Sequence, residues 1–244
     1  MCTVTFIPVK NRYFITSNRD EKYSRKKAIP PAIYTIDKSK LLFPKDPNAG
    51  GSWIALHENG NVAVLLNGAF VHHVHRPPYK KSRGKILLEI IESSLPIRFF
   101  TRMDLVHIEP FTLIVLDEDN LYECRWDGHQ KYCRQLNKNW HYIWSSATLY
   151  KYEIAKQREQ WFAAFLNNHP NPVQEDILHF HQFAGDGDEQ NDLKINRGQV
   201  STVSVTGISI DNEKGDMKYL DLRENKIYDK EINFIYSLQD EVMY

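Results

Sequence analysis

The second residue of the chain, Cys2, is the first side chain whose position suggests chemistry. If Met1 is removed, Cys2 carries a thiol and a free α-amino group on one carbon. An α-amino group has a pKa of about 7.7–8.0, so near neutral pH part of it is an unprotonated base beside the thiol. One residue would then supply nucleophile and base, as in the enzymes that use an N-terminal threonine. The alternative is that Cys2 is a small apolar residue starting a buried strand.

The segment from Asn18 to Glu21 is the first candidate partner of Cys2. Residues 3–8 and 12–17 are predicted to form a hairpin, which brings this segment beside Cys2. Arg19 would lower the pKa of the thiol, and Asp20 or Glu21 would orient the α-ammonium group. Adjacent residues of a strand face opposite ways, so Arg19 and Asp20 both reach Cys2 only if the strand bends between them, and we expect that bend. The alternative is a solvated turn with two ion pairs.

Two further strand ends carry polar groups. Asn67 ends the segment VAVLLN, where its amide is able to donate to an oxyanion. The alternative is an ordinary Asn-Gly turn. Ser145 and Ser146 lie where a short strand gives way to a loop, and their hydroxyls would either bind substrate or cap the next helix.

The elements that must position these residues are mostly strands. Residues 24–52 are expected to be an irregular loop, because they are rich in Pro, Gly and basic residues. The remaining pattern predicts strands at 3–8, 12–17 and within 53–67, helices at 82–94 and 103–108, strands within 111–136 and at 141–147, helices at 151–167 and 173–183, and strands at 199–211, 217–222 and 232–238.

The fold class follows from the apolar runs. The runs AVLL at 63–66 and TLIVL at 112–116 show little polar alternation, so their strands are expected to be covered on both faces. Two antiparallel sheets packed together between outer helices satisfy that condition. We therefore predict an α+β protein, a four-layer αββα sandwich, with a single domain over residues 1–244.

Several of these residues together resemble the NRDE-motif family of the transport-and-Golgi-organisation type. They are Cys2, the tetrapeptide NRDE at 18–21, GGSW at 50–53 and NG at 67–68, with SRG at 82–84 and STV at 201–203 also fitting. The resemblance covers most of the chain and implies the N-terminal nucleophile (Ntn) hydrolase fold. More distantly, the beginning of the chain is similar to the choloylglycine hydrolases, which cleave bile-salt amides and penicillin V with an N-terminal Cys.

The resemblance also implies roles for individual residues. It makes Cys2 the nucleophile and gives catalytic roles to Arg19, Asp20 and Asn67. It gives substrate-binding roles to Asn18, Glu21, Ser146 and Gln199. Ser146 stands where relatives carry an oxyanion-binding Asn, and Gln199 lies near a segment in which relatives tend to have Arg.

Composition excludes several partner classes. Lys plus Arg and Asp plus Glu number 31 each, so charge gives no case for binding nucleic acid or an anionic membrane. We find no apolar run near the ~18 residues of a membrane span and no signal-peptide core, so a soluble, cytoplasmic protein is expected.

The three cysteines are not expected to form a disulfide framework. Cys124 and Cys133 flank a predicted turn and are interpreted as reduced structural thiols, with a cross-strand pair as the alternative.

No metal or other cofactor is expected. The His segments at 72–75 and 179–181 lack zinc-site spacing, and the acidic segment 185–192 lacks that of an EF-hand. We therefore predict that Cys2 hydrolyses a C–N amide bond of a small molecule. The alternative is a non-catalytic binding or carrier protein for haem or a lipid-like ligand on the same fold, with an exposed His of 72–75 as axial haem ligand.

Overall fold

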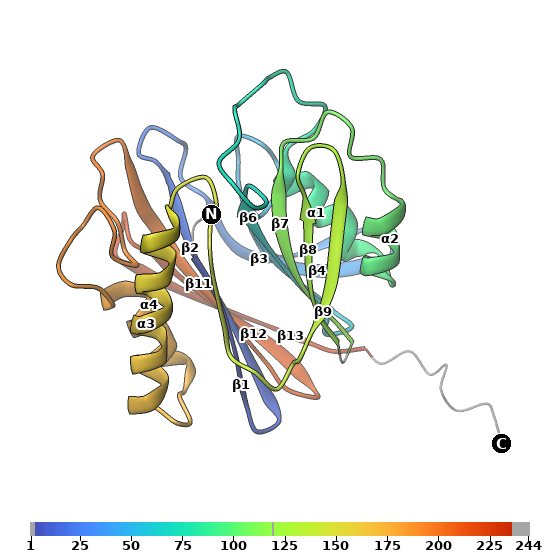
Figure 1. Ribbon diagram of the computed structural model, residues 1–244. Helices are drawn as coiled ribbons and strands as arrows, with labels where there is room; N and C mark the ends of the chain where they lie inside the picture. Colours follow the sequence, from blue (N-terminus) through green and yellow to red (C-terminus); the bar gives the residue numbers. More distant parts are fainter. Residues whose placement is uncertain (1–2, 119, 236–244) are drawn as a thin grey trace.

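The first hairpin joins β1 (Thr3–Val9) to β2 (Arg12–Lys22) and lies in the middle of a six-stranded sheet (Figure 1). Lys10 makes its turn with a φ of 54°, the left-handed conformation that a tight turn requires. The computed structural model describes residues 3–118 and 120–235. The sheet order is β10 (Tyr142–Ser145), β1, β2, β11 (Val200–Ile210), β12 (Lys214–Asp221) and β13 (Lys226–Asn233).

A second sheet of seven strands packs against the first. Its strands pair antiparallel in sequence order, from β3 (Ile29–Ile36), β4 (Ser39–Lys45), β5 (Ile54–His57) and β6 (Val62–Asn67) to β7 (Phe111–Asp117), β8 (Asn120–Trp126) and β9 (Lys131–Leu136). A core that includes Phe6, Trp53 and Tyr219 fills the space between the two sheets.

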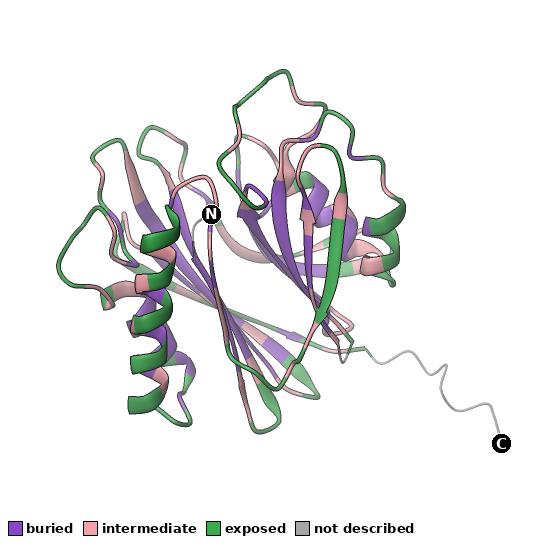
Figure 2. Cartoon of the chain, in the orientation of Figure 1, coloured by how far each residue is buried: buried purple, intermediate pink, exposed green. Residues whose placement is uncertain are grey.

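Helices cover the two outer faces, which gives the predicted αββα sandwich. The helices α1 (Arg83–Glu92) and α2 (Pro96–Arg102) cover the seven-stranded sheet, and α3 (Tyr152–Asn168) and α4 (Gln174–Phe183) cover the other. Figure 2 shows the burial that results, with exposed residues on the outward faces of the helices and buried ones along the strands. The helix predicted at 151–167 is confirmed, and its apolar face packs inward, because Phe162 and Phe165 lie in one core with Phe14.

The sequence prediction for residues 24–52 is wrong, because β3 and β4 form a hairpin there. Pro30 and Pro31 are tolerated because β3 is an edge strand, and the ladder is irregular between Ile29 and Ala32. The helix expected at 103–108 is also wrong. Asp104 Oδ1 accepts a hydrogen bond from the Val106 N–H at 3.0 Å, and such a side-chain turn competes with helix formation.

The ends of the chain limit two other predictions. The last strand described is β13, which ends at Asn233, so it overlaps only the beginning of the predicted 232–238 strand. Residues 236–238 and Cys2 lie outside the described residues. Among the helices that are described, none is long and apolar enough to cross a membrane.

Two glycines let a loop approach the start of α1 closely. The Ser52 N–H donates to the Gly84 carbonyl at 3.2 Å, and a Cβ built on Gly84 would lie 2.7 Å from the Ser52 carbonyl oxygen. A Cβ on Gly51 would lie 2.5 Å from the Lys85 nitrogen. Both neighbours are backbone atoms that cannot rotate away, so the GGSW and SRG segments require glycine where they meet.

We expect Gly51→Ala to destabilise the protein by about 2 kcal/mol or more, because overpacking a backbone contact forces the loop away from α1. Urea unfolding followed by circular dichroism measures the change. Gly187→Ala is the matched control: its φ is +88° and its Cβ would meet nothing within 4 Å. That variant should lower the free energy of unfolding by only about 1 kcal/mol, the cost of placing alanine in the left-handed conformation. Equal losses in the two variants would contradict the close-approach argument.

Candidate active site

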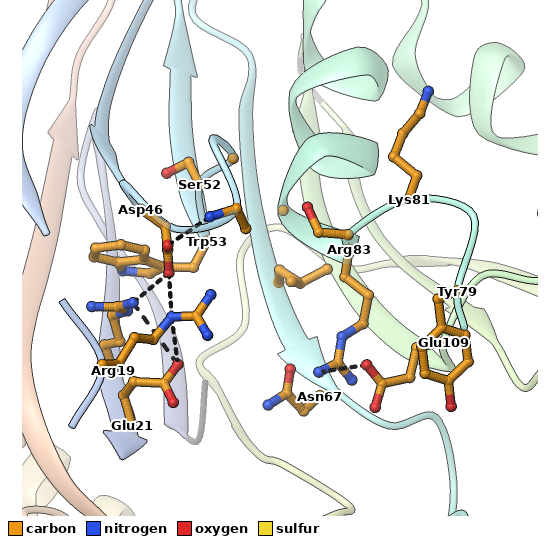
Figure 3. A pocket seen from close by; sticks show the side chains of 16 residues that line it. Arg19, Glu21, Asp46, Ser52, Trp53, Asn67, Tyr79, Lys81, Arg83 and Glu109 are labelled. Carbon is orange, nitrogen blue, oxygen red and sulfur yellow. Dashed lines mark hydrogen bonds and ion pairs between the residues drawn. The ribbon is translucent and has the colours of Figure 1, made fainter. Parts of the chain in front are cut away.

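A cavity of about 410 Å³ opens beside the inner face of β2. Figure 3 shows two groups of charged side chains on its walls, one around Arg19 and Asp46 and the other around Arg83 and Glu109. The other labelled residues that line the cavity come from the loop before β5, the end of β6 and the segment that leads into α1. The lining is mainly polar and charged, which suits a polar small molecule.

The first group is centred on the buried guanidinium of Arg19. Its Nη2 lies 2.7 Å from Asp46 Oδ2 and its charge sits 4.4 Å from the centre of the Trp53 ring. Burial lowers the pKa of Arg19, and Asp46 and Glu21 oppose that effect. Arg25 completes the group, since its Nε also lies 2.7 Å from Asp46 Oδ2.

Asp46 is shaped to hold this cation. Its Oδ1 accepts from the backbone N–H groups of Asn48 and Ala49 at 2.9 and 3.1 Å, which leaves Oδ2 for the two arginines. Burial alone raises the pKa of Asp46, but the hydrogen bonds from Arg25 and Ala49 and the two positive charges outweigh it. The pKa therefore stays below its usual value.

The second group pairs Arg83 with Glu109 across 3.1 Å, beside Asn67 (Figure 3). Asn67 is fixed through its backbone, because its carbonyl accepts a hydrogen bond from Ser146 Oγ at 2.8 Å. Gly68 follows with a φ of 78°, and a Cβ there would lie 2.8 Å from Thr148 Cγ2. The step from Asn67 to Gly68 is therefore held against the segment that contains Ser146, and the Asn67 side chain lines the cavity.

Asp20 lies on the opposite face of β2 from Arg19. Its two oxygens accept from the hydroxyls of Tyr150 at 2.8 Å and Thr202 at 2.5 Å. The ladder between β2 and β11 shifts register at this step, with Thr202 opposite Asp20 and Ser204 opposite Arg19. The bend that we expected between Arg19 and Asp20 does not turn both side chains to one face, because Arg19 lines the cavity and Asp20 does not.

Asn18 is also buried on that face. Its amide nitrogen donates to the carbonyls of His181 and Leu193, and its Oδ1 lies 2.6 Å from His181 Nδ1. Because an amide oxygen only accepts, Nδ1 carries the proton and Nε2 accepts from the Thr5 hydroxyl at 2.8 Å. Burial lowers the pKa of His181 to about 3, so this ring is neutral at physiological pH.

Arg158 of α3 joins this region to the first described residue. It is fully buried, and its Nη1 donates to Thr3 Oγ1 at 2.6 Å. Its remaining N–H groups donate to the carbonyls of Asn191 and Asp192, and its charge lies 3.6 Å from the centre of the Tyr150 ring. Arg158 therefore ties α3, the loop before β11 and the start of β1 together.

The predicted site residues therefore separate into two sets. Arg19, Glu21 and Asn67 line the cavity, whereas Asn18, Asp20, Ser146 and Gln199 are not among its lining residues. Gln199 is exposed in the loop before β11, where its carbonyl accepts from the Tyr23 N–H. Cys2 lies outside the described residues. Within the described ranges we find no group of His, Cys, Asp or Glu able to hold a metal ion.

Sequence reasoning missed Asp46, Tyr150 and Arg158. The sequence signal for Arg158 was present, since it lies four residues after Ile154 and four before Phe162 on the apolar face of a helix. A charged residue there is rarely buried without a specific partner. Asp46 gave no comparable signal, because Asp before Pro is ordinary in loops.

The fold is that of the Ntn hydrolases. One similar structure is the Caenorhabditis elegans ortholog of N-acylethanolamine-hydrolyzing acid amidase, with a TM-score of 0.60, 10% identity, and coverage of 85% of this chain and 92% of that one. Another is a mutant of the conjugated bile acid hydrolase from Clostridium perfringens, with a TM-score of 0.53, 9% identity and 97% coverage of both chains. At these identities the likeness concerns the fold alone.

The sequence itself gives the family. The family model described as Transport and Golgi organisation 2 matches residues 1–219. The chain therefore belongs to the Transport and Golgi organisation 2 family. The comparison with curated proteins found no match.

We expect Asp46→Asn to lower the free energy of unfolding by about 3 kcal/mol at pH 7, because it leaves Arg19 buried beside a neutral amide. The pKa of Asp46 is depressed in the folded state, so its contribution is complete above the unfolded value of about 3.9. The difference between wild type and variant should hold from pH 7 to about 5, then shrink as the pH falls below about 4.

Denaturant unfolding at several pH values measures this difference. The control is Asp229→Asn, which removes an exposed carboxylate 3.8 Å from Lys218 and should change stability by less than about 0.5 kcal/mol. If the difference in free energy of unfolding between wild type and Asp46→Asn grew as the pH fell, the assignment of the ion pair would be contradicted.

Proposed function

We propose that this protein is an N-terminal-nucleophile cysteine hydrolase that cleaves a C–N amide bond of a polar small molecule. In this proposal Met1 is removed and Cys2 is the nucleophile. The Ntn-hydrolase fold supports the class of reaction. The lining of the cavity supports a polar substrate, because few of its side chains are apolar, Trp53 and Leu65 among them. For the same reason we rank the alternative ligands, haem and a lipid-like molecule, lower.

The observation that carries the proposal is the register of the first hairpin. Thr3 pairs with Asn18, and Asn18 is followed by Arg19 on the cavity wall. Position 2 is one peptide bond from Thr3, so the two Cα atoms are about 3.8 Å apart. β1 therefore begins at the strand pair that precedes Arg19 on the cavity wall, and the proposal places the nucleophile there.

The proposed reaction uses two steps. The Cys2 thiol attacks the amide carbonyl and gives its proton to the α-amino group, and the Asn67 amide donates to the oxyanion that forms. When the C–N bond breaks, the α-ammonium group returns the proton to the leaving amine and a thioester remains. Water then hydrolyses the thioester with the α-amino group again as base, which releases the acid and restores the thiol.

The remaining polar residues have supporting roles in this proposal. Arg19 stabilises the thiolate by its charge, although Asp46 at 2.7 Å offsets part of that charge. Glu21 lies 3.4 Å from Arg25 and, with it, contacts the polar part of the substrate. Asp20 acts indirectly, because its oxygens are occupied by Tyr150 and Thr202, and it fixes β2 against β11 and Tyr150.

The test begins with the state of Cys2. Intact mass should show the loss of Met1, and iodoacetamide near pH 7 should label Cys2 faster than Cys124 and Cys133. Arg19→Ala should raise the pH midpoint of Cys2 labelling by about one unit, since a neighbouring cation lowers a thiol pKa by about one to three units and Asp46 moderates this one. Arg98→Ala, on the exposed side of α2, is the control and should leave the midpoint unchanged.

Activity is then measured with the processed protein against an N-acylethanolamine, a conjugated bile acid and a panel of small polar amides. Product formation should disappear in Cys2→Ala and in protein that retains Met1. Hydrolysis that survived both changes would exclude Cys2 as the nucleophile. Equal labelling of all three thiols would remove the argument for activation.

Arg158 is a positioning residue in this proposal, and we expect Arg158→Lys to lower kcat by roughly tenfold to a hundredfold with little change in KM. Lysine keeps the charge but loses the planar group that reaches Thr3 and two carbonyls together. The Cys2 labelling rate should fall with kcat. Lys156→Met, an exposed change on the same helix, is the control. A rise in KM alone at unchanged kcat would contradict the positioning role.

A further inference from the structure

Cys124 and Cys133 lie directly opposite one another on β8 and β9. Their Sγ atoms are 2.6 Å apart and share a hydrogen bond, and both thiols are free. Cys124 is completely buried in the core beneath α1 and α2, whereas Cys133 is exposed. The pair therefore combines a sheltered thiol with one that solutes can reach.

The neighbouring cross-strand pair holds the two thiols in register. Glu123 faces Arg134 one step along the ladder, and both Glu123 oxygens lie 3.1 Å from nitrogens of that guanidinium. Glu123 also accepts from Trp144 Nε1 at 2.8 Å. A slip of the edge strand β9 would break these contacts, so Cys133 stays opposite Cys124.

The hydrogen bond makes the two thiols unequal. The interaction with Cys124 lowers the pKa of Cys133, while the same interaction and burial raise the pKa of Cys124, so Cys124 is the donor once Cys133 is ionised. An exposed, more acidic thiol beside a second cysteine is the arrangement in which oxidation is selective and a disulfide can follow.

We propose that Cys124 and Cys133 form an oxidisable dithiol site whose co-reactant is a hydroperoxide and whose product is a cross-strand disulfide. Directly opposite residues have Cβ atoms about 4.5–5.5 Å apart, and a disulfide needs about 3.5–4.5 Å. Only a small local approach of β9 to β8 is therefore required. The disulfide would fasten the edge strand of the seven-stranded sheet to its neighbour.

The chemistry balances with one peroxide. The Cys133 thiolate attacks one peroxide oxygen, the O–O bond breaks, and hydroxide leaves, which gives a sulfenic acid at Cys133. Cys124 gives its proton to that hydroxide, forming water, and its sulfur attacks the Cys133 sulfur. The S–O bond breaks and the second oxygen leaves as hydroxide, which takes the proton first lost by Cys133. Two thiols are oxidised, and one hydroperoxide is reduced to two waters or to water and an alcohol.

The experiment uses the reduced full-length protein treated with hydrogen peroxide, alkylated with iodoacetamide and digested with trypsin without reductant. Tryptic cleavage follows Arg102, Arg125, Lys131 and Arg134, so the two cysteines fall in separate peptides, 103–125 and 132–134. We expect these two peptides to be linked, with the link removed by dithiothreitol. The oxidised protein should also melt a few degrees higher.

Two matched variants complete the test. In Cys124→Ala, a dimedone adduct at Cys133 should accumulate roughly tenfold or more above wild type, because no neighbouring thiol consumes the sulfenic acid. In Cys133→Ser, no linked peptide should form. If Cys124→Ala fails to fold, the wild-type map and the exposed Cys133→Ser variant still decide the question.

Three results would overturn the proposal. They are full alkylation of both thiols after peroxide, a link from peptide 1–10 that contains Cys2, and equal dimedone trapping in wild type and Cys124→Ala. The proposal is independent of the proposed hydrolase activity, since it makes no use of Cys2 or of the cavity.

Discussion

The buried guanidinium of Arg19 is the constraint on which the cavity depends. A cation this deeply buried is poorly hydrated, so it requires a carboxylate and a ring within reach, and the segment between β4 and β5 supplies Asp46 and Trp53. Asp46 in turn orders the loop that leads to Gly51, and this glycine allows that loop to lie against α1. One ion pair thus fixes the distance between the sheets and the position of the cavity walls.

The second organising feature is the alternation of β2. Arg19 and Glu21 face the cavity, while Asn18 and Asp20 face the helices, so one tetrapeptide serves two layers of the sandwich. On the helix side the polar groups form a connected cluster: Asp20 accepts from Tyr150, and Arg158 stacks on Tyr150 and reaches Thr3. This buried polar cluster fixes the beginning of β1 relative to the cavity.

Local pattern was enough for much of the fold. The helices α3 and α4 and the hairpin of residues 3–17 depend on patterns within a few residues, so they were predictable. The β3–β4 hairpin was not, because Pro30 and Pro31 argue against a strand until β3 is known to be an edge. The helix expected at 103–108 is absent, because the Asp104 side chain accepts from the Val106 N–H in a turn that competes with helix formation.

For the site, the sequence by itself determined which chemical groups are available: a cysteine at position 2, the NRDE tetrapeptide, and an Asn-Gly turn at the end of an apolar strand. Periodicity gives Arg19 and Asp20 opposite faces in an extended strand, but we expected a bend that would turn both to one side, and the two side chains diverge instead. Only the tertiary structure decided which face meets the cavity, that Asp46 is the partner of Arg19, and that Arg158 reaches Thr3. These are contacts between residues far apart in the chain, and they depend on how sheets and helices stack, which no local pattern encodes.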